Sequence, residues 1–219
     1  MKKTLLTLTA MVVAVGAFAQ GTIQFNNSTA GALTKIYMPD GYNAYGPVSA
    51  PVAGKTGNTA TDSQAGATVY TGALLQGAFT AELWAANGGG HNESELAFSG
   101  ATTTFRTGSG AGRLAVTTAT LNNVPNDAAL AAFQIRVFPT SYGSYANALA
   151  AFNAFDPLAW VGKSIVFEVG LIGGLVNTPP AMTTLTSFSL GANAVVPEPT
   201  SMALAGLGAA SLLIFRRRK

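Results

Sequence analysis

Short runs in which apolar and polar residues alternate are the feature that most constrains the fold of this 219-residue chain. In the run 78–87, AFTAELWAAN, every second residue from Phe79 to Ala85 is apolar, and Glu82 falls on the opposite face. Because successive side chains of a β-strand point to opposite faces, this pattern predicts a strand with one buried face. Clusters of Gly, Pro and Asn separate such runs. The pattern predicts an all-β domain, folded as an antiparallel β-sandwich.

The strand signal recurs along the chain, and the expected strands lie at 21–27, 78–87, 102–108, 113–121, 132–139, 164–172 and 184–192. In the run 132–139, Gln134 and Arg136 are expected to point away from the apolar face. In the run 164–172, the apolar face is expected to hold Ile165, Phe167, Val169 and Leu171. These faces would together enclose the core of the sandwich.

Two segments depart from the strand pattern. In 144–156 the large apolar residues recur at helical spacing, at Tyr145, Leu149, Phe152 and Phe155, which predicts one short helix crossing an end of the sandwich. The run 125–132 is a weaker candidate for a turn of helix. Residues 29–66, rich in Gly, Ala, Pro and Asn, predict a long loop-rich insertion with short strand pieces near 34–37 and 68–71.

The N-terminus reads MKKTLLTLTAMVVAVGAFAQ. Two lysines precede an apolar stretch at 5–18, which has the length of a signal peptide and is too short to span a bilayer comfortably. The small residues Ala17 and Ala19 flank Phe18, so signal peptidase is expected to cleave before Gln20. Residues 1–19 are therefore predicted to be a secretory signal peptide, and residues 20–195 to be the exported domain.

The C-terminus reads VPEPTSMALAGLGAASLLIFRRRK, at 196–219. Residues 200–215 lack charge and predict a transmembrane helix of about 24 Å, short against a hydrocarbon core of about 30 Å. The terminal cations are expected to stay on the cytoplasmic side and to orient the segment; they are Arg216, Arg217, Arg218 and Lys219. Two prolines around one glutamate, directly before this segment, favour an extended stretch that a protease can bind.

These three parts, in this order, resemble the PEP-CTERM sorting signal. The resemblance implies that an exosortase, a membrane-embedded protease, recognises the chain through Pro197, Glu198 and Pro199. It also implies an inner-membrane-anchored precursor, release to the cell surface or extracellular matrix, and association with exopolysaccharide. A plain membrane anchor is the alternative.

The body of the chain carries a second resemblance, in the runs TAELWAANG, TFRTGSGAG, FQIRVF, GSYANALA, IVFEVGLIGG and TSFSLGA. They resemble an uncharacterised exported domain that precedes PEP-CTERM signals in Verrucomicrobia-type bacteria. The resemblance covers about 21–195, favours the sandwich and implies no activity.

Charge and cysteine content exclude several classes of function. The net charge of +3 comes from the two ends, because residues 20–195 hold six cations and eight acids, for a net charge of −2. The six cations are scattered, whereas nucleic-acid binding needs them clustered. The chain has no cysteine, which excludes disulfides, thiolate metal sites and a cysteine nucleophile.

The one histidine, His91, lies in a loop with Glu93 and Glu95. A zinc site wants three or four protein ligands, so a solvated loop histidine is the expected state and no metal or cofactor is expected. Calcium is an alternative, with oxygen ligands from Asn92, Glu93 and Glu95 or from Asp40 and Asp62. A serine-type triad would use His91, but the chain has no GxSxG elbow.

Two carboxylates on expected strands, Glu82 and Glu168, are candidates for the acid pair of a glycoside hydrolase. They are expected instead to be solvated residues on the outer face. Seven aromatic residues are candidates for stacking on sugar rings: Trp84, Trp160, Tyr37, Tyr42, Tyr45, Tyr142 and Tyr145.

The sequence therefore favours a non-catalytic protein of the cell surface or extracellular matrix. A carbohydrate-binding module is the alternative, and a secreted hydrolase comes third. The expected partners are signal peptidase, exosortase, the membrane and extracellular polysaccharide, with no nucleic acid.

Overall fold

The computed structural model describes residues 20–29, 32–39, 70 and 72–191. The predicted signal peptide at 1–19, most of the predicted loop at 29–66, the strand piece at 68–71 except Tyr70, and the C-terminal segment 196–219 lie outside the described residues. Among the described residues, no helix is long and apolar enough to cross a membrane. The predicted transmembrane segment at 200–215 is not among them.

The described part consists mainly of strands, with one α-helix. The strands are β1 (Gln20–Phe25), β2 (Ser28–Thr29), β3 (Ala32–Leu33), β4 (Ile36–Tyr37), β5 (Phe79–Asn87), β6 (Ala97–Thr104), β7 (Thr117–Pro125), β8 (Leu130–Pro139), β9 (Gly162–Lys163), β10 (Phe167–Gly170) and β11 (Phe188–Ser189). The helices are α2 (Tyr145–Asn153) and the short 3-10 turns η1 (Glu93–Glu95), η2 (Gly108–Gly110) and η3 (Thr140–Tyr142).

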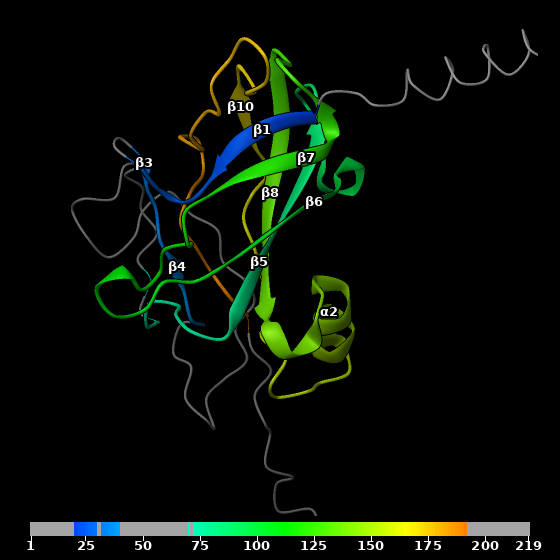
Figure 1. Ribbon diagram of the computed structural model, residues 1–219. Coiled ribbons are helices and arrows are strands. Elements are labelled where there is room, and N and C mark those ends of the chain that lie inside the picture. Colours follow the sequence, from blue (N-terminus) through cyan, green and yellow to red (C-terminus); the bar gives the residue numbers. More distant parts are fainter. Residues whose placement is uncertain (1–19, 30–31, 40–69, 71, 192–219) are drawn as a thin grey trace, which may run out of the picture.

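A five-stranded antiparallel sheet forms the centre of the fold, in the order β10-β8-β5-β6, with β9 also paired to β8. The antiparallel pair β1–β7 crosses in front of this sheet (Figure 1). A short parallel pair, β11–β4, lies beside it. The prediction of a strand-rich, antiparallel fold with one helix is therefore confirmed.

The core lies between the central sheet and the β1–β7 pair. From the sheet come the alternate residues of β5 and β8, such as Leu83 and Ile135, and from the pair come Ile23 and Leu121; all four are 0% exposed. The predicted inward faces of 78–87 and 132–139 are confirmed, because these rows are buried from end to end.

A buried asparagine ties the end of β1 to two other segments. The Asn27 side-chain amide donates to the carbonyls of Thr34 (3.0 Å) and Gly112 (2.9 Å), and its oxygen accepts from the Leu114 amide (2.8 Å). Since Asn27 is 1% exposed, these bonds satisfy polar atoms that water cannot reach.

Two predicted strands lie elsewhere along the chain than expected. The runs 102–108 and 113–121 overlap β6 and β7, but β6 begins earlier, at Ala97, and β7 ends later, at Pro125. The start of β6 was missed because its inward side chains include polar Ser99 and Thr103. Their hydroxyls donate to the carbonyls of Leu83 (2.7 Å) and Ala115 (2.8 Å), which compensates their burial.

The prediction that 164–172 forms one strand with one apolar face is wrong. Strand β10 covers only Phe167–Gly170, while Ile165 and Leu171 are 46% and 67% exposed. Leu171 adopts a left-handed backbone (φ 54°), which reverses the alternation and buries Ile172 in its place. The run 184–192 likewise reduces to the two-residue β11, and 34–37 to β4.

The helix is confirmed, and its predicted face is confirmed in part, because Phe152 packs against the cluster that contains Tyr145. Tyr145 and Ala148 are buried, whereas Leu149 faces solvent and Phe155 follows the helix in a left-handed conformation (φ 62°) at 79% exposure. The predicted helical turn at 125–132 is wrong, because Asp127 forms a turn (φ 53°) and β8 begins at Leu130.

Candidate functional site

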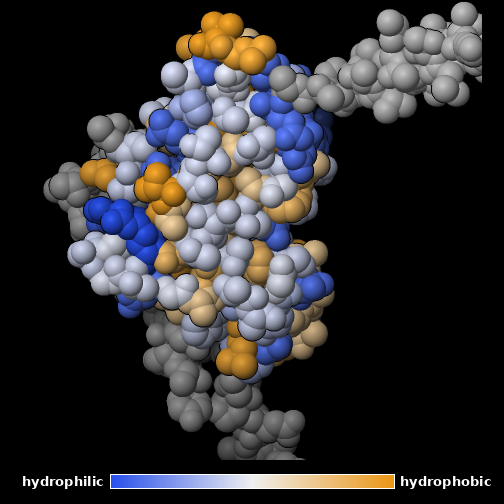
Figure 2. Space-filling view, viewed as in Figure 1, coloured by the Kyte–Doolittle hydropathy of each residue, from blue (hydrophilic) through white to orange (hydrophobic). Residues whose placement is uncertain are grey.

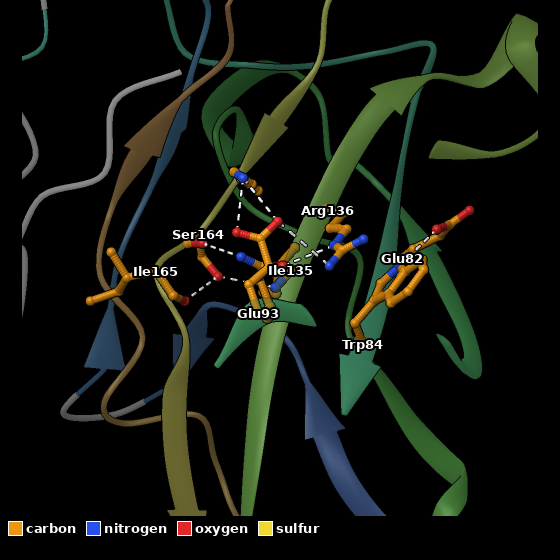
Figure 3. A network of polar contacts seen from close by, with 9 residues as sticks. Glu82, Trp84, Glu93, Ile135, Arg136, Ser164 and Ile165 are labelled. Atoms are coloured by element: carbon orange, nitrogen blue, oxygen red, sulfur yellow. Dashed lines mark hydrogen bonds and ion pairs between the residues drawn. The ribbon is translucent and has the colours of Figure 1, made fainter. Parts of the chain in front are cut away.

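Among the described residues, a group of charged and aromatic side chains lies on the outer face of the central sheet (Figure 3). Cross-strand register sets Glu82 opposite Arg136 and Trp84 opposite Gln134. Because side chains alternate along each strand, all four point away from the core. Lys163 of β9 is in register with Arg136 on its other side. The sheet itself therefore brings these groups together.

Arg136 is the centre of this group. Its guanidinium carbon lies 3.7 Å from the centroid of the Trp84 ring and 5.5 Å from that of Tyr145, both within cation–π range. Its Nε donates to Gln134 Oε1 (2.8 Å). Burial lowers the pKa of Arg136, against the attraction of Glu93, Tyr145 and Glu82. The guanidinium is therefore in contact with two aromatic rings and remains charged.

Glu82 fastens helix α2 to the sheet. Its two carboxylate oxygens accept from the backbone N–H of Tyr145 (3.0 Å), the first residue of α2, and from the Trp84 indole N–H (3.0 Å). A carboxylate at a helix N-terminus also interacts favourably with the helix dipole. The prediction that Glu82 is a solvated outer-face residue is wrong, because α2 covers it and leaves it 7% exposed.

Glu93 fastens η1 to the same face. Both its oxygens accept from Lys163 Nζ at 2.8 Å, and Oε1 lies 3.7 Å from Arg136 Nη2. Burial acts to raise the pKa of Glu93, but the bond and charge of Lys163, with help from Gln134 and Arg136, outweigh it and lower the pKa. Together Asn92, Glu93, Ser94 and Arg136 line a shallow depression of about 630 Å³.

The hydroxyl group of Tyr145, which lies beside this depression, stays protonated. Burial raises the pKa of the Tyr145 hydroxyl to about 12, and the opposing attraction of Arg136 is smaller. Tyr145 therefore stays neutral over the physiological range, and its ring serves as packing for Arg136.

His91 lies near this group, but its two ring nitrogens contact residues only four positions away in the sequence. Its Nε2 lies 2.9 Å from the Asn87 carbonyl oxygen, and its Nδ1 lies 3.8 Å from Glu95 Oε2. Within the described ranges, no three His, Asp or Glu side chains gather closely enough to hold a metal ion. The calcium candidates Asp40 and Asp62 lie outside those ranges.

The two candidate acids of a hydrolase are far apart. Glu168 is in register with Ala132, four residues along β8 from Arg136, the partner of Glu82. This offset is about 13 Å, and β5 and β10 also flank β8 on opposite sides. Glycoside hydrolases hold their carboxylates about 5–9.5 Å apart. Glu168, exposed on β10, accepts instead from the Gly90 amide (2.6 Å).

Most of the described aromatic candidates already pack or bond within the protein. Tyr37 is buried and stacks on Tyr70 at 4.6 Å, Trp160 stacks on Phe79 at 5.9 Å, and Tyr142 donates to Asp156 at 2.9 Å. The Arg136 guanidinium lies over the Trp84 ring, and Tyr145 is buried. Tyr42 and Tyr45 lie outside the described residues.

The comparisons with known proteins concern the C-terminus. Residues 195–219 match the PEP-CTERM protein-sorting motif. The chain carries a PEP-CTERM sorting signal. The motif marks an exported protein that an exosortase processes, so the predicted resemblance at this end is confirmed. No curated protein and no solved structure matches the chain.

The individual roles expected for residues of the PEP-CTERM signal, and the cleavage before Gln20, stay predictions. So does the resemblance of 21–195 to a domain of Verrucomicrobia-type bacteria. The group around Arg136 was not predicted as a unit. The sequence did carry a signal for it. Glu82 and Arg136 both fall on the outward faces of expected strands, and pairing of those strands would place them on one shared face.

Glu82→Gln tests the attachment of α2. We expect the free energy of unfolding to fall by about 1.5–3 kcal/mol, because two bonds to a buried carboxylate weaken. Urea denaturation, followed by the fluorescence of the two tryptophans Trp84 and Trp160, measures the change. Glu95→Gln is the control, since glutamine can still accept from the Asn92 amide at this exposed position and the expected change is about 0.5 kcal/mol or less. Equal effects of the two changes would contradict the role of Glu82.

Acidification tests the ion pairs of Glu93. Its folded pKa is lowered, so the ion pairs stabilise the fold above the unfolded pKa, and this contribution is lost as pH falls through the folded pKa. Glu93→Gln should unfold at a lower denaturant concentration than the unchanged protein at pH 7. The two midpoints should converge as the pH falls below the lowered folded pKa of Glu93. A difference that stays constant across this range would show that charge is not responsible.

Proposed function

We propose that this chain is a non-catalytic protein of the cell surface or extracellular matrix, which is exported, processed by an exosortase and associated with extracellular polysaccharide. The sorting motif at 195–219 carries the proposal. In this scheme residues 1–19 direct export, 200–215 anchor the precursor, and the exosortase recognises Pro197, Glu198 and Pro199.

The non-catalytic part of the proposal is supported by the pairing of charges around Arg136. Glu82 and Glu93 are each held by two or more donors or cations. A general acid or base needs an accessible group with a pKa near the working pH. Neither the lowered pKa of Glu93 nor the raised pKa of Tyr145 suits this role.

The association with polysaccharide is supported by an uncharged surface. Strands β1, β6 and β7 contain no Asp, Glu, Lys or Arg. Their exposed positions include the hydroxyl and amide side chains of Thr102, Thr104, Thr118, Thr120 and Asn122. The surface over β1 and β7 is largely pale in Figure 2, which marks intermediate hydropathy. Such side chains can exchange hydrogen bonds with the hydroxyls of a neutral glycan.

Processing is tested on the protein that producing cells export. Intact-mass measurement should give a chain that lacks residues 1–19 and the segment after the Pro-Glu-Pro motif. A Pro197→Ala, Pro199→Ala double variant should accumulate as a membrane-bound precursor, whereas Pro179→Ala, which lies in the body, should be processed normally. An exported chain that retains residues 200–219 would contradict the proposal.

Association with polysaccharide is tested by sedimentation with the insoluble extracellular polymer of the producing cells. The exported form should sediment with the polymer, and Thr118→Glu, Thr120→Glu should sediment severalfold less, because buried or unpaired charge is costly at a neutral contact. Ser109→Glu, at an exposed hydroxyl outside these strands, is the control. Equal sedimentation of the unchanged protein and the double variant would show that this surface is not the contact.

A further inference from the structure

The loop between α2 and β9 exposes two large apolar side chains. Phe155 is 79% exposed and Leu158 is 69% exposed. Phe155 also has a left-handed backbone (φ 62°), which is rare for a bulky residue and strained. Figure 2 includes an orange area at the lower end of the molecule, over the loop below α2 in Figure 1. A strained residue that presents its ring to solvent suggests a contact there. We call residues 154–159 the α2 loop.

The α2 loop lies beside the point where the described chain ends. Gly191, the last described residue, exchanges two backbone hydrogen bonds with Val161, at 2.8 and 3.2 Å. Val161 follows Leu158 closely in the sequence, and the next residue, Gly162, pairs with Val137 near the end of β8. The chain therefore leaves the described part at the end of the domain that carries α2.

Few residues separate this end from the predicted anchor. The sorting motif covers 195–219, and the predicted transmembrane segment begins at Thr200, so that residues 192–199 alone lie between it and Gly191. A stretch of this length spans at most about 30 Å when fully extended. The sorting motif also implies that the precursor is anchored. In that precursor, the α2 end of the domain therefore stays within about 30 Å of the bilayer, whereas the loop beyond β10 lies at the other end of β8.

The backbone of the α2 loop can leave water without losing hydrogen bonds from its amides. Every N–H group of the loop donates to an acceptor within the protein, and Pro157 has none to satisfy. This arrangement matters because hydrocarbon offers no hydrogen-bond acceptors. The acceptors are the carbonyls of Ala150, Ala151, Phe152 and Asp156 and the carboxylate of Asp156.

The α2 loop and its surroundings carry one charge. Asp156 is the only Asp, Glu, Lys or Arg at 137–162. Its carboxylate accepts from the Tyr142 hydroxyl and from the Leu158 N–H, each at 2.9 Å, so both oxygens are bonded within the protein. Because this stretch has no cation, attraction to anionic headgroups contributes nothing. Contact with a membrane would depend on burial of apolar surface alone.

The small size of this apolar surface favours lipid near an anchor over a protein partner. Two side chains bury far less than the roughly 1,200 Å² of a stable protein–protein interface. They are also too few to hold a free protein on a bilayer, since even one acyl chain gives only marginal, reversible binding. An anchored domain does not need such affinity, because its short tether keeps the loop at a high effective concentration near the lipid.

We propose that the α2 loop is a lipid-contacting element of the anchored precursor, in which Phe155 and Leu158 insert into the bilayer surface. The contact orients the domain with its α2 end toward the membrane. Because it depends on the tether, cleavage by the exosortase also releases it. This inference rests on the proposed anchor at 200–215 and is independent of the proposed binding of polysaccharide.

The absence of cysteine from the chain allows a direct test. Leu158→Cys gives a single site for an environment-sensitive fluorophore. Ala150→Cys, exposed on α2, controls for nearness to the membrane, and Val176→Cys, 86% exposed beyond β10, controls for an apolar position at the other end. The precursor without its signal peptide, residues 20–219, is reconstituted into phosphatidylcholine vesicles with or without nitroxide-labelled lipid. We expect the label at 158 to shift to shorter wavelength and to be quenched at least severalfold more than either control.

Flotation of the same vesicles measures anchoring separately. A chain that floats with the vesicles but is quenched equally at 158 and 150 would overturn this inference and leave the anchor intact; an exosortase contact would then be the remaining reading of the loop. A chain that does not float would contradict the anchor at 200–215 and this inference with it.

A second variant tests the role of Phe155. Adding Phe155→Asn to Leu158→Cys should lower the quenching severalfold, because the aromatic ring is lost while asparagine readily adopts the same left-handed backbone. Phosphatidylglycerol in the vesicles should not increase the quenching. Unchanged quenching in the Phe155→Asn variant would count against insertion of the loop. A blue shift at 158 that appears without vesicles and grows with protein concentration would also overturn the proposal, and would indicate a second copy of the chain.

Discussion

The contact between the central sheet and the β1–β7 pair is what the rest of the structure depends on. The chain has no cysteine, so no disulfide can hold its layers together. Instead, the inward rows of β5 and β8 meet Ile23 and Leu121 of the pair in one continuous core. With that face of the sheet buried, the opposite face is available for charged residues, and α2 and η1 lie over it.

The outer face is organised around Arg136. Glu82 ties α2 to the sheet and Glu93 ties η1 to it, and the guanidinium lies near both carboxylates and over the Trp84 ring. Arg136, Glu82 and Glu93 therefore serve to attach α2 and η1 to the sheet. The functional information in the chain lies chiefly in the sorting motif at 195–219, while the body supplies the uncharged strands β1, β6 and β7.

The parts of the fold that could be predicted are those where apolar side chains alternate without interruption, as in β5 and β8. Prediction failed where polar side chains took inward positions, as Ser99 does in β6, because hydrogen bonding replaces hydrophobicity there. It failed again where a single left-handed residue, Leu171, reversed the alternation. Neither event has a signal in the local pattern. The outward position of Glu82 was predicted correctly, but its burial depends on where α2 packs, which sequence spacing cannot specify.

The pairing of β1 with β7 has a consequence for the order of events during export. Gln24 and Thr118 are in register although 94 residues separate them, and the bonds of Asn27 to Gly112 and Leu114 span a similar interval. A chain that is threaded through a membrane from its N-terminus delivers β1 long before β7. Until then, the first strand has an unpaired edge, and edges of this kind invite pairing with other chains. During that interval β1 can pair wrongly with another chain. A chaperone that binds the emerging polypeptide on the far side of the membrane would have its greatest effect then.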